Sequence, residues 1–147
     1  MKSFFVTLVF SFFLFHAQSQ TDSIKNNSKI ADTANAAKII VIRETGHIGS
    51  AVNLSILVDK INYCKIRNNR YTEFFAEPGT HVFYAKTWDQ ANVSEKLGLN
   101  IPLEAGKTYY LTAHIKPRFM STDIFLEEVT YNTARPLMEK YKLDACR

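Results

Sequence analysis

Residues 52–88 carry the pattern that most narrowly limits what this chain can fold into. Residues 52–59 alternate between apolar and polar side chains, as a strand does when only one of its faces is buried. Turn signals follow at residues 59–60, 68–69 and 77–80, and the last of these contains Pro78 and Gly79. Three turns so close together predict neighbouring antiparallel strands.

Further strands are predicted on both sides of this stretch. Residues 37–43 form a compact apolar run rich in β-branched side chains, and residues 93–103 and 108–117 place apolar side chains at alternate positions. Gly106 lies in a turn between the last two, where glycine supplies the positive φ that such a turn needs. Residues 122–130 are predicted to form the last strand.

The period of the sequence changes near its C-terminus. Thr133 is a suitable N-cap, Pro136 is compatible with a first helical turn, and apolar residues recur at helical spacing at Ala134, Leu137, Met138, Tyr141 and Ala145. We predict a short helix docked on one face or end of the sheets. Residues 37–147 as a whole are predicted to form an all-β domain, an antiparallel two-sheet sandwich of about seven to eight strands with this helix.

The N-terminus has the pattern of a secretory signal peptide that ends at residue 19. Lys2 supplies a positive charge, residues 4–15 are an apolar run, and Ala17 and Ser19 provide small residues for a cleavage site. Because a spanning helix needs roughly 20 apolar residues, cleavage is preferred to an uncleaved anchor. No Cys follows the run for acylation, so a lipoprotein is not expected.

Residues 20–36 are polar and lack an apolar period, which predicts a flexible linker before the domain. The protein is therefore expected to be secreted or periplasmic, with no stable membrane span after signal cleavage. The formal net charge of +4 falls to +3 once Lys2 is removed. Because Lys and Arg are dispersed and no aromatic and basic RNA-binding motif is present, no nucleic-acid partner is expected.

Two cysteines, Cys64 and Cys146, would reach an oxidising compartment, where such a pair can form one disulfide. The alternative is two separate thiols, with Cys64 packed in a strand. The cysteines and histidines lack ligand pairs at short spacings, so neither a metal site nor a cofactor is predicted.

Several segments, taken in order, carry a family resemblance. They are Gly49-Ser50-Ala51, a hydrophobic strand ending at Asp59, Pro78-Gly79-Thr80-His81, and Glu104-Ala105-Gly106-Lys107-Thr108-Tyr109-Tyr110. In this order and separation, over about residues 38–129, the chain resembles the bacterial family called domain of unknown function 2846. The resemblance implies a small envelope-associated β domain and no particular biochemical activity. The chain departs from the family pattern at Lys60, Cys64 and Asn69.

Aromatic residues make up 13% of the chain, more than a small core strictly requires. Tyr84, Trp88 and Tyr110 are predicted to share one surface, where their rings could stack on a sugar or a peptide. Phe119 and Met120 are adjacent apolar residues in a polar loop and could contact a partner. The alternative for all five residues is packing against a second layer, the helix or an open end of the sandwich.

The leading functional hypothesis is a non-catalytic secreted or periplasmic envelope module that binds an unknown envelope protein or small ligand. A second hypothesis is a hydrolase in which His81, His114 and a carboxylate, from Asp59 or Glu104, converge in a cleft. A third is a small-ligand carrier with a pocket between the sheets. No serine lies in a nucleophile elbow, which argues against serine hydrolysis.

Overall fold

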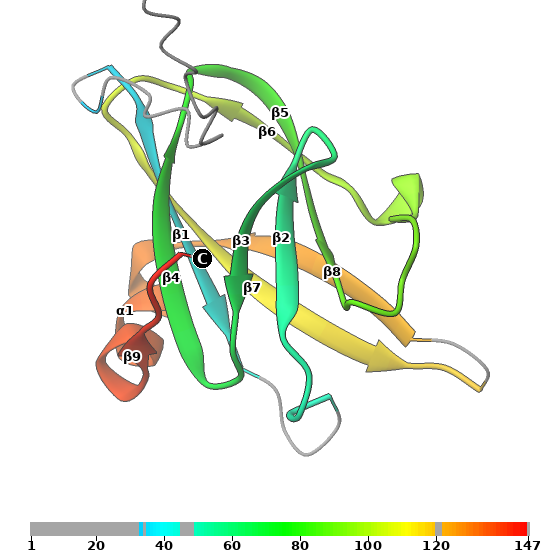
Figure 1. Cartoon of the computed structure of the whole chain (residues 1–147). Coiled ribbons are helices and arrows are strands. Elements are labelled where there is room, and N and C mark those ends of the chain that lie inside the picture. Colours follow the sequence, from blue (N-terminus) through cyan, green and yellow to red (C-terminus); the bar gives the residue numbers. More distant parts are fainter. Residues whose placement is uncertain (1–32, 34, 45–48, 120–121, 147) are drawn as a thin grey trace, which may run out of the picture.

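Two facing β-sheets and one helix form the part of the chain that the structure, a computed structural model, describes: residues 33, 35–44, 49–119 and 122–146 (Figure 1). Along the chain the elements are β1 (Ala37–Arg43), β2 (Leu54–Val58), β3 (Ile61–Ile66), β4 (Arg70–Ala76), β5 (Gly79–Lys86), the 3-10 helix η1 (Glu95–Leu97), β6 (Leu99–Leu103), β7 (Thr108–Pro117), β8 (Thr122–Val129), α1 (Tyr131–Lys140) and β9 (Lys142–Leu143).

The two sheets differ in the direction of their strands. The four-stranded sheet has the order β3-β2-β5-β6 and is antiparallel throughout. The five-stranded sheet has the order β8-β7-β1-β4-β9, in which β1 is parallel to β7 and β4 is parallel to β9. The predicted two-sheet, mostly β architecture with a short C-terminal helix is confirmed.

The predicted antiparallel arrangement of about seven to eight strands was wrong in two respects. Nine strands form within the described residues, and two strand pairs are parallel. Of the three turns in residues 52–88, only the turn at residues 59–60 closes a hairpin, between β2 and β3. The turns at residues 68–69 and 77–80 instead carry the chain from one sheet to the other, because β4 lies in the five-stranded sheet and β3 and β5 do not.

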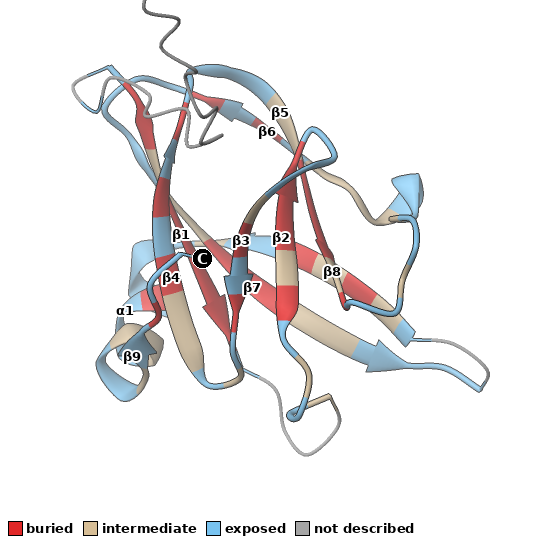
Figure 2. Ribbon diagram, in the orientation of Figure 1, coloured by how far each residue is buried: buried red, intermediate tan, exposed pale blue. Residues whose placement is uncertain are grey.

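Strand β1 is buried on both faces, which explains its continuous apolar sequence. Ile39 and Val41 point between the sheets and belong to the main core, whereas Ile40 and Ile42 lie in a second cluster with Ala134 of α1. Figure 2 shows this burial along the central strands. A strand covered on both sides loses the alternation of polar and apolar residues.

Helix α1 begins at Tyr131 with Thr130 as its N-cap, three positions earlier than predicted, so Pro136 lies inside the helix and not in its first turn. Proline removes one helical hydrogen bond. Ala134, Leu137 and Met138 nevertheless pack into the cluster around Ile40 and Ile42. Tertiary packing therefore outweighs the local cost of the proline.

The stretch at residues 93–103 is another correction. It was predicted to be one strand, but only Leu99–Leu103 is a strand, and Glu95–Leu97 form a turn of 3-10 helix. This segment crosses the outer face of the four-stranded sheet: a side chain at Gly98 would come within 2.7 Å of both Tyr84 Cε1 and Val82 Cγ1. Close contact with Tyr84 therefore fixes the path of this segment.

The last residues, 141–146, form what we term the C-terminal strap, which crosses from β4 toward β3 (Figure 1). The buried carboxylate of Asp144 accepts hydrogen bonds from the Arg67 guanidinium at 2.7 and 3.0 Å, and from the Arg67 backbone N–H at 3.1 Å. Cys146 and Cys64 of β3 lie at disulfide distance, with their Cα atoms 5.0 Å apart. The predicted pairing of the two cysteines is thus matched by their placement.

Three predictions fall on residues outside those that the structure describes. They are the signal peptide at 1–19, most of the linker at 20–36, and the contact role of Met120. Within the described ranges, no helix combines the length and the apolar character that crossing a membrane requires.

Candidate binding groove at one end of the sandwich

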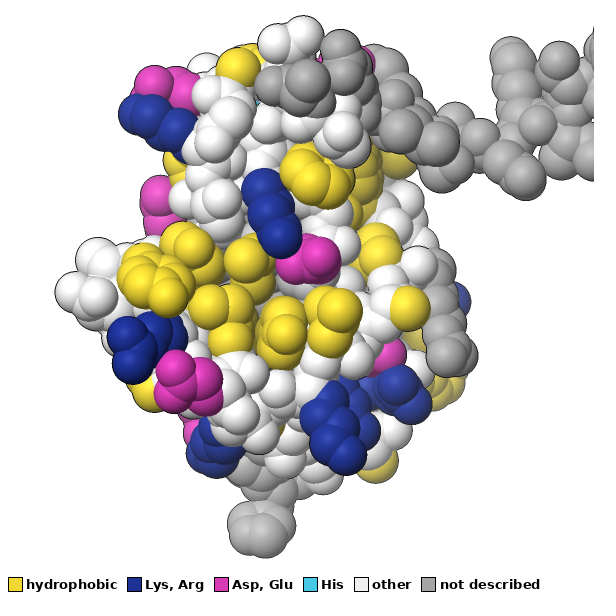
Figure 3. Space-filling model, turned by 90° about the vertical axis from the view of Figure 1, so that its left-hand side faces the viewer, with side chains coloured by type: hydrophobic (Ala, Val, Ile, Leu, Met, Phe, Trp, Pro, Cys, Tyr) yellow, Lys and Arg dark blue, Asp and Glu magenta, His cyan; other side chains and the backbone are white. Residues whose placement is uncertain are grey.

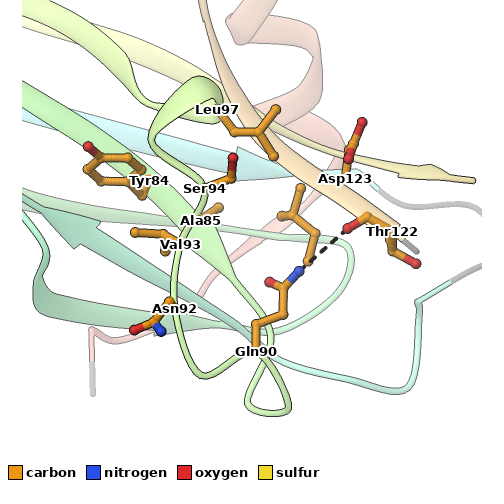
Figure 4. Close-up of a pocket in the computed structure, with 10 residues that line it drawn as sticks. Tyr84, Ala85, Gln90, Asn92, Val93, Ser94, Leu97, Thr122 and Asp123 are labelled. Atoms are coloured by element: carbon orange, nitrogen blue, oxygen red, sulfur yellow. Dashed lines mark hydrogen bonds between the residues drawn. The ribbon is translucent and has the colours of Figure 1, made fainter. Parts of the chain in front are cut away.

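A short turn after β5 presents Trp88 at the surface. The Gln90 side chain holds this turn, because its Oε1 accepts the Thr87 N–H at 3.2 Å while the Gln90 N–H donates to the Thr87 carbonyl at 3.3 Å. Gln90 Nε2 also donates to the Thr122 carbonyl of β8 at 3.4 Å, as Figure 4 shows. Trp88 is 81% exposed, although its turn is tied to both sheets.

Beside this turn lies a groove with a cavity volume of about 660 Å³. We call it the Trp88 groove. Its apolar lining comes from Val52, Ile115 and Ile124, and its polar lining from the turn at residues 87–90 together with Arg118 and Thr122. Strands β7 and β8 of the five-stranded sheet therefore meet loops that adjoin β2 and β5 of the four-stranded sheet in it. A volume of this order is typical of small-molecule sites, which range over roughly 300–1,000 Å³.

Gly49 closes part of the groove by close contact with Ile115. Its φ is +75°, and a Cβ at this position would lie 2.7 Å from Ile115 Cδ1. The positive φ therefore favours glycine, and a larger residue would also have to displace the end of the Ile115 side chain. The resemblance described above also included Gly49, for which the structure supplies this physical reason.

A smaller hollow of about 130 Å³ adjoins the groove and shares Gln90, Thr122 and Ile124 with it (Figure 4). Its remaining lining comes mainly from residues 92–97 and from Tyr84. Gln90 thus forms part of the wall of both cavities. Gln90 was not among the residues predicted from the sequence to take part in a site.

The charges at the groove are largely balanced. Arg118 is paired with Asp123 through its Nε, and Asp89 is the other charged residue of the lining. Phe119, which follows Arg118 directly, is fully exposed. Two of the predicted contact residues, Trp88 and Phe119, are therefore exposed, and both lie on segments that border the groove.

The other two predicted aromatic residues in the described part do not join them. Tyr84 is buried on the outer face of the four-stranded sheet, beneath residues 92–98. Tyr110 lies on the outer face of the five-stranded sheet, where its ring contacts that of Tyr131 at 5.6 Å between centroids. Because β5 and β7 belong to different sheets, the structure does not assemble Tyr84, Trp88 and Tyr110 into one platform.

The two histidines of the hydrolase hypothesis lie in different sheets, each beside its own carboxylate. His81 Nδ1 is 2.7 Å from Asp59 Oδ2, and its Nε2 is 3.0 Å from the Glu77 carbonyl. His114 Nε2 is 3.2 Å from Glu127 Oε2. The cleft that would unite His81 with His114 is therefore not formed.

Asp59 has a structural role in the turn between β2 and β3. Asp59 and Lys60 both have left-handed backbone conformations, with φ of 51° and 67°. Burial pushes the pKa of Asp59 upward, but hydrogen bonds from the Val82 N–H and from His81 outweigh burial and leave that pKa below its usual value. The ionised carboxylate therefore braces a turn that contains no glycine.

Arg43 is a buried cation that the sequence analysis missed. It is fully buried, donating from Nη1 to the Ile66 carbonyl at 3.0 Å and from Nη2 to the Gly49 carbonyl at 2.7 Å. Its Nε has no hydrogen-bond partner among the described residues. Burial lowers its pKa to about 10. The available signal was position, since Arg43 continues the inward face of Ile39 and Val41 along β1.

Exposed apolar side chains also occur away from the groove. Phe75, Tyr131 and Leu143 are between 38% and 52% exposed. Figure 3 shows one face of the molecule, on which a group of hydrophobic side chains is bordered by charged ones. Lys38 and Glu73 form an ion pair at 2.8 Å. The described residues contain no group of three His, Cys, Asp or Glu side chains placed to hold a metal ion.

No protein-family model matches this chain, and no curated protein matches it. The resemblance to domain of unknown function 2846 therefore remains a prediction, and the geometry described above carries the functional argument.

Proposed function

We propose that this protein is a non-catalytic binding module, secreted or periplasmic, that engages its ligand or envelope partner through the Trp88 groove. The observation that carries the proposal is a largely exposed tryptophan on a hydrogen-bonded turn beside a cavity of about 660 Å³. An aromatic ring exposed on a rigid turn loses little conformational freedom when it is covered by a ligand, which favours binding.

The proposed secreted or periplasmic location rests on the sequence pattern of residues 1–19, which resembles a cleaved signal peptide. The proposed pairing of Cys64 with Cys146 agrees with this location, because disulfides persist in oxidising compartments. The position of the groove also changes the carrier hypothesis, which placed a pocket between the sheets. We propose that a small ligand would bind in the Trp88 groove at the end of the sandwich, and not in the packed space between the two sheets.

Site-specific crosslinking tests the proposal in the cells that make the protein. A photoreactive amino acid is placed at Phe119, beside the groove, and in a matched chain at Tyr131 on α1, which is 51% exposed. We expect one reproducible crosslinked species from position 119, absent from position 131 and lost when Trp88→Ala is added. Equal crosslinking from both positions, or crosslinking that survives Trp88→Ala, would contradict the proposal.

Fractionation of the same cells tests the proposed location of the protein. We expect mature protein in the periplasm or medium, with an N-terminus at residue 20. Full-length protein retained in the cytoplasm would contradict the secreted location.

A further inference from the structure

We infer that the Trp88 groove binds a neutral saccharide, with one sugar ring stacked on the Trp88 indole. This inference rests on the proposed function and names the chemical class of its ligand. It follows from three properties of the groove: its combination of aromatic and polar lining, its charge, and its position relative to the strands.

The lining suits a ligand that has both an apolar face and a polar edge. Trp88 offers an exposed indole, and Ile115 and Ile124 provide apolar walls. Thr87, Gln90 and Thr122 add neutral hydrogen-bonding groups around them. A sugar ring has a C–H face that packs on an aromatic ring and hydroxyl groups at its rim that exchange hydrogen bonds with amides and hydroxyls. A lipid chain could not use the hydrogen-bonding capacity that these groups retain beyond their bonds to one another.

The charge of the lining argues against an anionic ligand. It contains one acidic residue, Asp89, and one basic residue, Arg118, and with the Asp123 carboxylate beside Arg118 the three groups carry a net charge of −1. Arg118 is moreover already paired with Asp123. An anion such as a phosphate would have to displace the Asp123 carboxylate from Arg118, whereas a neutral polyol can bind without breaking this ion pair.

The position of the groove argues against an extended peptide. Peptides that bind β domains commonly add a strand to a free sheet edge and pair with its backbone. Only the start of the edge strand β8, Thr122 and Ile124, borders the groove, and the Thr122 carbonyl already accepts a hydrogen bond from Gln90. The rest of the lining comes from the end of β7, from loops and from the turn at residues 87–90, so little backbone is available to pair with a peptide. Binding there depends on side chains, and Trp88 is the largest of those that are exposed.

The experiment uses the mature protein purified after expression of the full chain. Trp88 is the only tryptophan in the sequence, so tryptophan fluorescence reports directly on the groove. The probes are neutral trisaccharides of N-acetylglucosamine, glucose in α- and β-linkage, and mannose, together with inorganic phosphate and a random peptide library. We expect one trisaccharide to shift the emission and to saturate below about 10 mM, and phosphate to have no effect.

Calorimetry then compares variants, since Trp88→Ala removes the fluorescent probe. We expect Trp88→Ala to weaken saccharide binding at least about tenfold, Trp88→Phe to retain part of it, and Tyr131→Ala to leave it unchanged. Amide NMR shifts on adding the sugar should map to the lining residues and not to α1.

Each other outcome is decisive. If no saccharide binds, or if binding survives Trp88→Ala, the saccharide inference is wrong. If a peptide binds at the groove and saccharides do not, the inference is wrong while the proposed binding function stands. If neither binds and crosslinking from position 119 also fails, both are wrong.

Discussion

The C-terminal strap and the Trp88 groove are held by different kinds of interaction. The strap is fixed by strand pairing with β4, by the buried Asp144 carboxylate against Arg67, and by the Cys64–Cys146 pair. The groove has no such covalent link among its described residues. Its turn is held by the hydrogen bonds of Gln90, and its largest side chain, Trp88, points into solvent.

This difference separates residues that hold the fold from residues that are free to serve binding. Buried, fully paired groups at the strap contribute to the free energy of unfolding, and removing any of them leaves a partner unpaired. Exposed groups at the groove contribute little to folding, so they are free to contact a ligand. Mutations in the strap should therefore lower the free energy of unfolding, whereas mutations at the groove should weaken binding and leave stability nearly unchanged.

Among changes at the strap and at the groove, the largest effect is expected from the cysteines. Cys64→Ser with Cys146→Ser opens a loop of 82 residues' separation. We expect the free energy of unfolding to fall by about 4 kcal/mol, because the unlinked unfolded chain gains conformational entropy. Urea denaturation measures the loss. A reductant should cause the same loss of stability in the natural protein and none in the double variant. An equal response of both proteins would contradict a stabilising disulfide in the strap.

The next effect is expected from Asp144→Ala, which removes the buried carboxylate that Arg67 contacts. Charge-assisted hydrogen bonds to a buried group are worth more than those at the surface, so we expect a loss of about 2 kcal/mol in the free energy of unfolding. Glu139→Ala is the matched control, because Glu139 pairs with Arg135 on the exposed face of α1. A similar change in the two variants would show that the strap is no more important than a surface ion pair.

A smaller, pH-dependent effect is expected from Asp59→Asn. Asn also tolerates a positive φ, so this change tests the carboxylate alone. Because the pKa of Asp59 is lowered in the fold, its ionised form stabilises the protein above the ordinary pKa of about 4, and that stabilisation is lost as the pH falls through the lowered value.

We therefore expect Asp59→Asn to cost about 1 kcal/mol at neutral pH and progressively less in acid. Urea denaturation of both proteins at pH 7 and pH 3 measures this difference. The exposed Asp89→Asn serves as the control for loss of a negative charge. A cost that is the same at both pH values would mean that the carboxylate's charge is unimportant for this turn.

The smallest effect on stability is expected from Trp88→Ala. Trp88 is 81% exposed, so we expect the free energy of unfolding to change by less than about 0.5 kcal/mol, while binding at the groove is lost. Phe83→Ala, at a fully buried position of β5, should instead cost about 3–5 kcal/mol. A large loss of stability in Trp88→Ala would contradict this expectation, because it would show that Trp88 stabilises the fold and is not simply part of a binding surface.

Much of the strand content could be predicted from local pattern, but the order of strands could not. The limits of β1 and β7 were predicted to the residue, because both are bounded by clear changes in polarity. Their parallel pairing depends on contacts between residues about 70 positions apart, such as Ile39 with Tyr109, which no local period encodes. The leucine alternation before Leu99 failed because a 3-10 turn also accommodates Leu97 there.

The candidate site was predictable only in part for a similar reason. Sequence identifies Phe119 as an apolar residue in a polar loop, and Trp88 as one of three aromatic residues expected to share a surface. It does not tell whether a ring is covered, and Tyr84 is buried while Trp88, four residues later, is exposed. Gln90 and Arg43 were missed because their roles arise from contacts with Thr122, Ile66 and Gly49 on other segments.

The central place of β1 sets the time at which this chain can fold. β1 is synthesised early and can pair with β4 once residue 76 has been made, but its other neighbour, β7, is complete only at residue 117. Strand β9, at residues 142–143, is the last strand to join the sheet, beside β4. A fold dominated by such distant pairings forms slowly. The ribosome therefore has to deliver residues 37–143 before the five-stranded sheet can be complete.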